Sequence, residues 1–459
     1  MRVGRRRESS EGSHWTQERR KIETTLRNRD TVRKEGSEKA LLVGVRPPTQ
    51  GVDELTEALD ELSRLAQTAQ ITPVGRITQR RETIDATFFV GEGKAREIAR
   101  QAKRVGAETV IFDDDLSPAQ ARNLERIIER RILDRTELIL EIFARNARTK
   151  EAAIQVEIAR LSYLLPRLAR RWSHLHRQRG GIGLREAGES QIELDRRIVR
   201  ERIQKLEREL ALIRSRRETR RKRRRNCFTV ALVGYTNAGK STLLRAMTGS
   251  KVVVADRLFA TLDAKVSLLP NELRPPVLLI DTVGFIKKLP PHLVASFKST
   301  LEEVAEADLL LHVVDLSHPA FAQQIATTDR ILSDLGLEET PRLHVFNKID
   351  RVTDPARFNL LRRHFPDGIC VSGETGEGIE TLERQIFTFF ERGMVDRSLR
   401  LRYDEQGFVR EIREMARILE EAFEEEGVRV RYRTTAALAD RIERRFHEFH
   451  ATRSMVGTL

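Results

Sequence analysis

The chain has 459 residues, 39% of them hydrophobic, which is enough for about three domains with packed cores. Charged residues make up 33% and the formal net charge is +14, which indicates an anionic partner without separating nucleic acid from an acidic protein or a membrane surface. No apolar run is long enough to cross a membrane, and the basic N-terminus lacks the apolar segment of a secretory signal. The two cysteines, Cys227 and Cys370, are far apart, which favours a reducing compartment over a disulfide or a metal site. We therefore expect a cytoplasmic protein with no integral membrane segment.

The first part of the chain changes character near residue 39. Residues 1–38 are rich in arginine and lack a hydrophobic period, which predicts a disordered basic extension, a solvated tail rather than a dedicated nucleic-acid arm. Residues 39–148 alternate strand-like and helix-like runs, which predicts an N-terminal α/β domain with a parallel sheet. Within it, Ser117 is a candidate N-cap because proline follows at the first helical position. The run Gly91–Lys94 is too short for a phosphate loop and favours a turn over a second nucleotide site.

Residues 149–225 carry two long helical patterns. Apolar side chains step by three and four residues in each, at Ile154, Ile158, Leu161, Leu165 and Leu168 and again at Val199, Ile203, Leu206, Leu210 and Ile213. Two such seams with a short connection predict an antiparallel helical hairpin. Around the glycine-rich connection Gly180–Gly183 the chain is basic, at Arg167, Arg170, Arg171, Trp172, His174, His176, Arg177 and Arg179. A solvated helix end is the simpler interpretation, but the charge pattern favours a finger that contacts RNA phosphates. The cations of Arg220–Arg225 fit an RNA contact, a localisation-like patch or a solvated linker.

The stretch Phe228–Thr242 carries the most specific motif. The apolar run Val230–Val233 predicts a buried strand, and Thr242–Met247 predicts a helix. Between them lies a G-x-x-x-x-G-K-S sequence, formed by Gly234, Tyr235, Thr236, Asn237, Ala238, Gly239, Lys240 and Ser241. A strand before and a helix after are the context of a phosphate loop, whose backbone N–H groups form an anion cradle. The pattern predicts a nucleoside-triphosphate site in which Lys240 reaches the β- and γ-phosphate oxygens and Ser241 binds Mg²⁺.

Residues 226–393 alternate further strands with amphipathic helices. The strand candidates are Phe228–Val233, Lys265–Leu269, Val277–Ile280, Leu309–Val314, Leu343–Phe346 and Gly368–Val371. This order predicts a P-loop domain with a doubly wound α/β sheet and its ligand at the carboxyl ends of the strands. Residues 394–459 predict a small C-terminal α/β module of order β-α-β-α, at Leu399–Tyr403, Val409–Phe423, Val428–Tyr432 and Leu438–Phe446. Its exposed strand faces are basic, which suits an accessory binding role.

Two segments after the phosphate loop indicate a nucleotide-dependent switch. Asp281, Thr282, Val283 and Gly284 follow an apolar strand, where the aspartate can hold Mg²⁺ through water and the Gly284 N–H can meet the γ-phosphate. Before them stand Phe259, Ala260, Thr261, Leu262 and Asp263 in a segment without period. Thr261 is the candidate second hydroxyl on Mg²⁺, ordered when the γ-phosphate is present. We expect Ser241 and Thr261 as metal ligands and Lys240, Thr261 and Gly284 as the catalytic groups.

Two further segments select guanine. Asn347, Lys348, Ile349 and Asp350 follow the fifth strand of this domain, and a carboxylate at Asp350 accepts from guanine N1–H and the 2-amino group. Adenine leaves such a carboxylate unpaired and is rejected. Ser372, Gly373 and Glu374 follow the last strand and would present a backbone N–H to the guanine oxygen. The motifs in this order predict a Mg²⁺-dependent GTPase that binds GTP and GDP.

The residue after Gly284 departs from the pattern of small GTPases. A glutamine there orients the attacking water in those proteins, whereas this chain has Phe285, which cannot hydrogen-bond to water. We therefore expect slow intrinsic hydrolysis that is accelerated by a partner.

From about Leu41 onward the chain resembles the HflX family of ribosome-associated GTPases. The resemblance rests on Phe88–Lys94, Asp134–Phe143, Gln155–Leu168, the GGIG and GESQIE sequences of the glycine-rich loop, the FATLD switch, and DTVGF with its Phe285. It departs in that loop, where Leu184, Glu186 and Ala187 replace the family's Thr, Gly and Pro. The resemblance implies a factor that binds the ribosome through large-subunit rRNA, in some members splitting or rescuing stalled ribosomes. It implies a monomer stimulated by ribosomes, and some relatives also bind ATP through the N-terminal domain.

Two other functions remain open at this point. A GTPase that drives an RNA- or tRNA-modifying partner would use the same switch, but it calls for a catalytic cysteine or a one-carbon site, and Cys227 and Cys370 lie in strand-like contexts. A scaffold that only reports the nucleotide state would not need the intact Lys240, Ser241 and Asp281.

Overall fold

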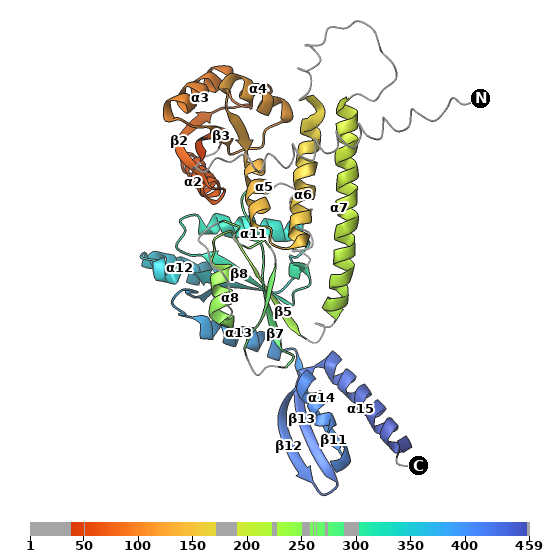
Figure 1. Cartoon of the computed structure of the whole chain (residues 1–459). Coiled ribbons are helices and arrows are strands. Elements are labelled where there is room, and N and C mark those ends of the chain that lie inside the picture. Colours follow the sequence, from red (N-terminus) through yellow and green to blue (C-terminus); the bar gives the residue numbers. More distant parts are fainter. Residues whose placement is uncertain are drawn as a thin grey trace, which may run out of the picture. The chain divides into compact units, whose positions relative to one another are not determined.

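The computed structural model describes residues 38–49, 51–170, 191–222, 227–249, 258–259, 261–262, 264–270, 274–288 and 303–456. These residues divide into two compact units, one with the described residues up to 142 and those of 157–208, the other with residues 143–156 and the described residues from 209 onward. Figure 1 labels their helices and strands. The predicted N-terminal extension lies outside the described residues, as do the glycine-rich connection and its cations from Arg171 to Arg179. None of the helices in the described ranges is long and apolar enough to pass through a bilayer.

The first unit contains a four-stranded parallel sheet of order β2-β1-β3-β4, which confirms the predicted α/β alternation. Its strands are β1 (Glu38–Arg46), β2 (Ile71–Arg80), β3 (Thr109–Phe112) and β4 (Arg131–Asp134), and its helices are α2 (Val52–Thr68), α3 (Glu92–Val105) and α4 (Pro118–Ile128). Ser117 caps α4 as predicted, because its side chain accepts from the Gln120 N–H and the Gln120 side chain accepts in return. Gly91 precedes α3, and Lys94 pairs with Glu97 at 2.8 Å, so Gly91–Lys94 forms a helix start.

The predicted hairpin helices are α6 (Lys150–Leu164), continued by a 3₁₀ turn over Leu165–Arg170, and α7 (Gln191–Lys222); α5 (Arg135–Asn146) comes before them. Two ion pairs fix their relative direction. Lys150 on α6 contacts Glu209 on α7 at 2.5 Å, and Glu157 contacts Arg202 at 2.8 Å. From the first ion pair to the second, the residue number increases along α6 and decreases by the same amount along α7. The two helices therefore run antiparallel.

The nucleotide domain is built on a six-stranded sheet of order β10-β9-β8-β5-β7-β6, parallel except for β6. All six predicted strands are present, as β5 (Phe228–Val233), β6 (Lys265–Leu268), β7 (Val277–Asp281), β8 (Leu309–Asp315), β9 (Arg342–Asn347) and β10 (Ile369–Cys370). The helices are α8 (Lys240–Thr248), α11 (Phe321–Asp334), α12 (Pro355–His364) and α13 (Ile379–Glu391). Both cysteines lie half-buried in this domain and form no disulfide.

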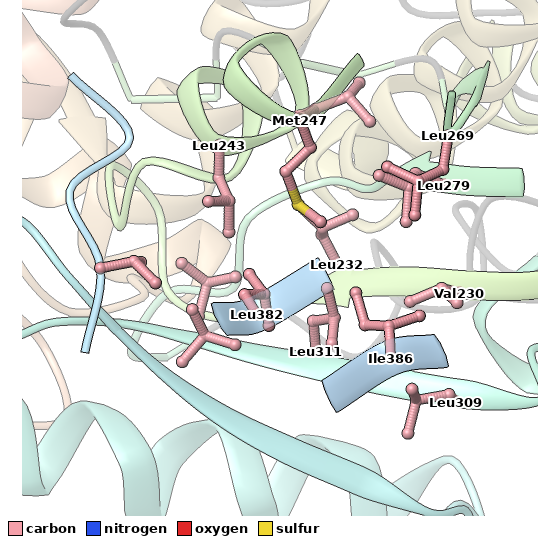
Figure 2. Close-up of a cluster of buried hydrophobic side chains, with 14 of the residues drawn as sticks. Val230, Leu232, Leu243, Met247, Leu269, Leu279, Leu309, Leu311, Leu382 and Ile386 are labelled. Carbon is pink, nitrogen blue, oxygen red and sulfur yellow. The ribbon is translucent and has the colours of Figure 1, made fainter. Parts of the chain in front are cut away.

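Alternation along β5 explains why both faces of this sheet are covered. Val230 and Leu232 point into a core with Leu243 of α8 and Ile386 of α13 (Figure 2). Ala231 and Val233 point into a second core, which also contains Leu332 of α11. Because β5 lies in the middle of the sheet and is buried on both sides, it reads as a continuous apolar run and holds the loop at its carboxyl end in place.

The C-terminal module corrects one prediction. It contains β11 (Met394–Leu401), α14 (Phe408–Met415), β12 (Arg417–Glu424), β13 (Gly427–Thr435) and α15 (Ala436–Val456). The predicted helix Val409–Phe423 ends at Met415, and its second half is the strand β12, antiparallel to β13 in a sheet of order β11-β13-β12. Main-chain pairing with β13 outweighs the local helical spacing, and Phe423, the last apolar position of that spacing, is 71% exposed.

The exposed face of this sheet is less basic than its sequence indicates. Arg429, Arg431 and Arg433 alternate along β13, but each meets a carboxylate. The contacts are Arg429 to Glu424 at 3.1 Å, Arg431 to Glu420 at 3.7 Å and Arg433 to Asp396 at 2.6 Å. Because these cations are paired on their own sheet, the module offers less uncompensated charge to an anionic partner than predicted.

Candidate nucleotide-binding site

The phosphate loop needs glycine at both of its ends. Gly234 leaves β5 with φ of +143°, and a Cβ there would lie 2.1 Å from the Val313 carbonyl oxygen. Gly239 stands before α8 with φ of +92°, and a Cβ there would lie 2.2 Å from Asn347 Nδ2. Any side chain would force neighbouring strands away, so the backbone can pass close to them only as glycine. The loop thus delivers its N–H groups and the N-terminus of α8 to one point.

Lys240, the first residue of α8, is buried beneath this loop. It is 6% exposed, and its Nζ donates to the Gly234 carbonyl at 3.1 Å and to the Tyr235 carbonyl at 2.9 Å. Burial lowers the pKa of Lys240 to about 8; the charge of Asp281 opposes this shift and that of Lys348 adds to it. The lysine is therefore a buried cation poised for anionic oxygens, since a nearby phosphate would favour its charged form.

Three oxygens meet where a Mg²⁺ site is predicted. Ser241 Oγ lies 2.9 Å from Thr261 Oγ1, and Asp281 Oδ2 accepts from Ser241 at 2.6 Å and from Thr261 at 3.0 Å. Asp281 is fully buried, and its Oδ1 has no hydrogen-bond partner among the described residues. A buried carboxylate oxygen without a partner is costly unless a cation or its water satisfies it. Two hydroxyls and a carboxylate are ligands that suit Mg²⁺, so the residues present fit this ion.

The switch segment that carries Thr261 is held from α5, a contact that the sequence did not predict. Phe259 is 2% exposed, its carbonyl accepts from Asn146 Nδ2 at 2.8 Å, and its ring meets the Phe143 ring edge-on with centroids 4.7 Å apart. Leu262 is also buried, whereas Ala260 and Asp263 lie outside the described residues. Asn146 is 113 positions from Phe259, and no local pattern marks such a pair.

The loop after β7 is bonded to the phosphate loop on both sides of Phe285. The Phe285 N–H donates to the Gly234 carbonyl at 3.0 Å, and the Thr236 N–H donates to the Phe285 carbonyl at 2.7 Å. The Phe285 side chain is 2% exposed and packs in the second core of this sheet, the one that contains Ala231. Thr282 donates to the Leu232 carbonyl at 2.7 Å, and Val283 is buried. The loop is thus fixed by its main chain, with the phenylalanine ring directed into the protein.

The segments predicted to bind the base are joined by Asn347. Its Nδ2 donates to the Ala238 carbonyl at 2.9 Å, and its Oδ1 accepts from the Gly373 N–H at 2.9 Å. The Gly373 N–H, one of the backbone groups of Ser372–Glu374 predicted to face guanine, is thus bound to the protein, which makes the Glu374 N–H a better candidate. Glu374 is largely exposed, at 3.8 Å from Arg245. The asparagine fixes the phosphate loop and the last loop of the sheet to each other.

Asp350 is oriented by a neighbouring hydroxyl. Ser372 Oγ, fully buried, donates to Asp350 Oδ1 at 2.6 Å. Lys348 has φ of +64° and pairs with Asp315 at 2.7 Å, and Ile349 is half-buried beside them. The structure therefore brings the described members of all five motifs to the carboxyl edge of one sheet, as expected for a doubly wound fold.

Arg167 is the one member of the predicted basic tip whose side chain the structure describes, and it is engaged elsewhere. Its Nη2 donates to the Asp134 carboxylate at 2.9 Å and to the Leu116 carbonyl at 2.7 Å, and its guanidinium lies 3.5 Å from the centre of the Tyr163 ring. Tyr163 also donates to Asp134, at 2.7 Å. Burial raises the pKa of Asp134 despite these partners. Arg167 therefore stabilises the N-terminal domain and is a poor candidate for RNA contact.

Comparison with known proteins identifies three consecutive family matches. Residues 56–144 match the family described as GTP-binding GTPase N-terminal, 146–224 the GTP-binding GTPase middle region, and 229–348 the 50S ribosome-binding GTPase. A solved GTP-binding protein of Sulfolobus solfataricus in complex with GDP is 24% identical and covers 76% of this chain and 98% of its own, but its TM-score of 0.41 is too low to support an argument.

Three curated relatives match over three quarters or more of their own length. GTPase HflX of Gluconacetobacter diazotrophicus is 42% identical, over 88% of this chain and 97% of that protein. GTPase HflX of Escherichia coli is 43% identical, over 82% of this chain and 89% of that protein. The relative of the same name from Flavobacterium psychrophilum is 50% identical, over 68% and 76%. Identity at this level across all three matched regions shows that the chain belongs to the HflX family of GTPases and is a GTP hydrolase.

Proposed function

We propose that this GTPase acts on the ribosome, through the large subunit, and hydrolyses GTP with Mg²⁺ at the edge of the six-stranded sheet. The observation that carries the ribosome assignment is the match of residues 229–348 to the 50S ribosome-binding GTPase family. The net charge of +14 supports a polyanionic partner such as rRNA. The basic residues Arg170–Arg179 remain the candidate contact, with Arg167 removed from that set. We propose a cytoplasmic monomer.

At the site, the proposed phosphate ligands are the N–H groups of Gly234–Ser241, the Lys240 ammonium and the Gly284 N–H. These assignments are supported by the contacts that join the phosphate loop, the buried Lys240 and the loop after β7. A bound Mg²⁺ would neutralise developing phosphate charge. Ser241 and Thr261 would hold it directly, and Asp281 through water.

For the base, the proposed contacts are the Asp350 carboxylate with guanine N1–H and the 2-amino group, and a backbone N–H of Ser372–Glu374 with the guanine oxygen. The Ser372 hydrogen bond to Asp350 Oδ1 supports this, because it orients the carboxylate for the base, and the other carboxylate oxygen lies 3.8 Å from the exposed Arg351. Asn347 would act by bracing the loops, and Lys348 by covering the base.

The proposal predicts hydrolysis that depends on ribosomes. Single-turnover GTP hydrolysis is to be measured with the protein alone, with large subunits and with small subunits as the control particle. We expect a slow rate alone and acceleration by large subunits only, since partner groups can contribute about 10³–10⁵-fold in other GTPases. Co-sedimentation in GTP, GDP and a non-hydrolysable analogue tests binding separately. A fast rate without ribosomes, or equal stimulation by small subunits, contradicts the proposal.

A further inference from the structure

The burial of Phe285 leaves open which group of this chain contacts the attacking water. The ring is 2% exposed and packs behind the sheet, and two main-chain hydrogen bonds to the phosphate loop fix the residue there. To reach the phosphates the ring would have to leave this core, while the two bonds hold the main chain of Phe285 in place. A polar group from another position must therefore face the water.

Thr236, the third residue of the phosphate loop, lies at the right place. A Cβ on Gly284 would lie 2.7 Å from Thr236 Cα, 2.8 Å from Thr236 Cγ2 and 3.0 Å from Lys240 Nζ. Gly284 is the residue whose N–H is proposed to meet the γ-phosphate, and Lys240 is the cation proposed for the same oxygens. The Thr236 side chain therefore lies at the γ-phosphate end of the cradle.

The hydroxyl of Thr236 is buried and lacks a protein partner. The residue is 6% exposed, and Oγ1 makes no hydrogen bond to any residue that the structure describes. Burying a hydroxyl in this way costs about 1–3 kcal/mol, a cost that a protein retains where the group serves a ligand. The Thr236 N–H is bonded to the Phe285 carbonyl, so the main chain of Thr236 is held against the loop after β7.

We propose that the Thr236 hydroxyl is a catalytic group that hydrogen-bonds the attacking water and directs its lone pair at the γ-phosphorus. In the step, the water oxygen forms a bond to the γ-phosphorus while the bond to the β,γ-bridging oxygen breaks. The bonding electron pair leaves with GDP, and a water proton passes to a γ-phosphate oxygen. Thr236 gains and loses no proton overall. The proposal rests on the proposed site, and its claim is about orientation of the nucleophile.

The test compares Thr236→Val, which keeps the shape and removes the hydroxyl, with Thr236→Ser, which keeps the hydroxyl. Single-turnover hydrolysis at saturating GTP is measured together with affinity for GDP, for a non-hydrolysable GTP analogue and for GDP with aluminium fluoride. We expect Thr236→Val to slow hydrolysis by about 10–100-fold and to weaken the aluminium fluoride complex, with both ground-state affinities and the melting temperature retained. Thr236→Ser should hydrolyse GTP at nearly the wild-type rate.

Thr328 on α11 provides a matched control. It is fully buried, and its Oγ1 also has no hydrogen-bond partner among the described residues, but it lies outside the nucleotide motifs. Thr328→Val should leave the hydrolysis rate unchanged. If Thr236→Val hydrolyses GTP at the wild-type rate, or if Thr236→Ser loses as much as Thr236→Val, the proposal is wrong. Lys240→Ala tests the site itself, because normal nucleotide binding by that variant would overturn the proposed site whatever Thr236 does.

Discussion

The contact between α5 and the switch segment makes a quantitative prediction. Thr261 lies beside Ser241 and Asp281, and two residues earlier the Phe259 carbonyl accepts from Asn146 Nδ2 at 2.8 Å. Phe259 has φ of +56°, a conformation that costs a non-glycine residue about 1–3 kcal/mol and persists only where the surroundings hold it. The Asn146 hydrogen bond is one of the contacts that hold it.

Asn146→Ala should loosen the switch without affecting the phosphate loop. The variant loses one neutral hydrogen bond and leaves a buried carbonyl without its partner, a loss of about 1–2 kcal/mol. This corresponds to a change of about 5–30-fold in the equilibrium that places Thr261. In the proposed site a GTP analogue needs Thr261 in place and GDP does not, so the two affinities should respond differently.

Calorimetric titration with GDP and with a non-hydrolysable GTP analogue measures this difference. We expect affinity for the analogue to fall about 5–30-fold and affinity for GDP to remain. Asn123→Ala is the control for loss of an asparagine side chain, because Asn123 Nδ2 donates to the Thr87 carbonyl at 3.0 Å in the N-terminal domain, an amide-to-carbonyl bond that is more exposed than that of Asn146. Equal losses for both nucleotides, or the same loss in Asn123→Ala, would refute the assignment of α5 as the support of the switch.

Three other predictions concern the base, a proton and the basic finger. Asp350→Asn should lower affinity for GTP by about 1.5–3 kcal/mol and favour xanthosine nucleotides; unchanged selectivity for GTP would contradict the base assignment. Because burial lowers the pKa of Lys240 to about 8 and bound phosphate favours its charged form, GDP binding should take up a proton above about pH 8, and affinity should fall as the pH rises further, by up to about tenfold per pH unit. Calorimetry at pH 9 in two buffers of different ionisation enthalpy measures this uptake, and its absence would contradict the prediction. Charge reversal at Arg170, Arg171 and Arg177 should weaken ribosome co-sedimentation and its salt dependence while GTP affinity is kept; equal co-sedimentation would rule out the finger.

The nucleotide domain was predictable because its information is local. Each motif directly follows an apolar run, and parallel strands of one sheet end at the same edge. Asn347 and Asp281 are therefore placed near Ser241 by topology alone, before any contact is known. The structure adds distances to this arrangement, such as the 2.6 Å hydrogen bond from Ser241 to Asp281.

Contacts between distant segments were not predictable in this way. The strand β12 has the apolar spacing of a helix, and its pairing with β13 decides its conformation. A backbone N–H of Ser372–Glu374 was expected to face guanine, yet the N–H of Gly373 donates to Asn347 Oδ1. In both cases a hydrogen bond to a separate segment overrides what the neighbouring residues favour, and a single sequence does not record which segment that will be.

The two loops that would sense the γ-phosphate differ in how they are attached. The loop after β7 exchanges two main-chain hydrogen bonds with the phosphate loop through Phe285, and its phenylalanine ring is packed in the core, so its position is set by the fold. The switch segment is held by side chains instead, through Asn146 and Phe143 of α5 and through the Thr261 hydroxyl. Side-chain contacts of about 1 kcal/mol each can be exchanged when a ligand is lost, whereas a main-chain bridge anchored in a packed core cannot move without disrupting that core. Loss of the γ-phosphate should therefore release the switch segment first. Because Asn146 is the last residue of α5, the release of Phe259 should act first on that end of α5, without any movement of Gly284.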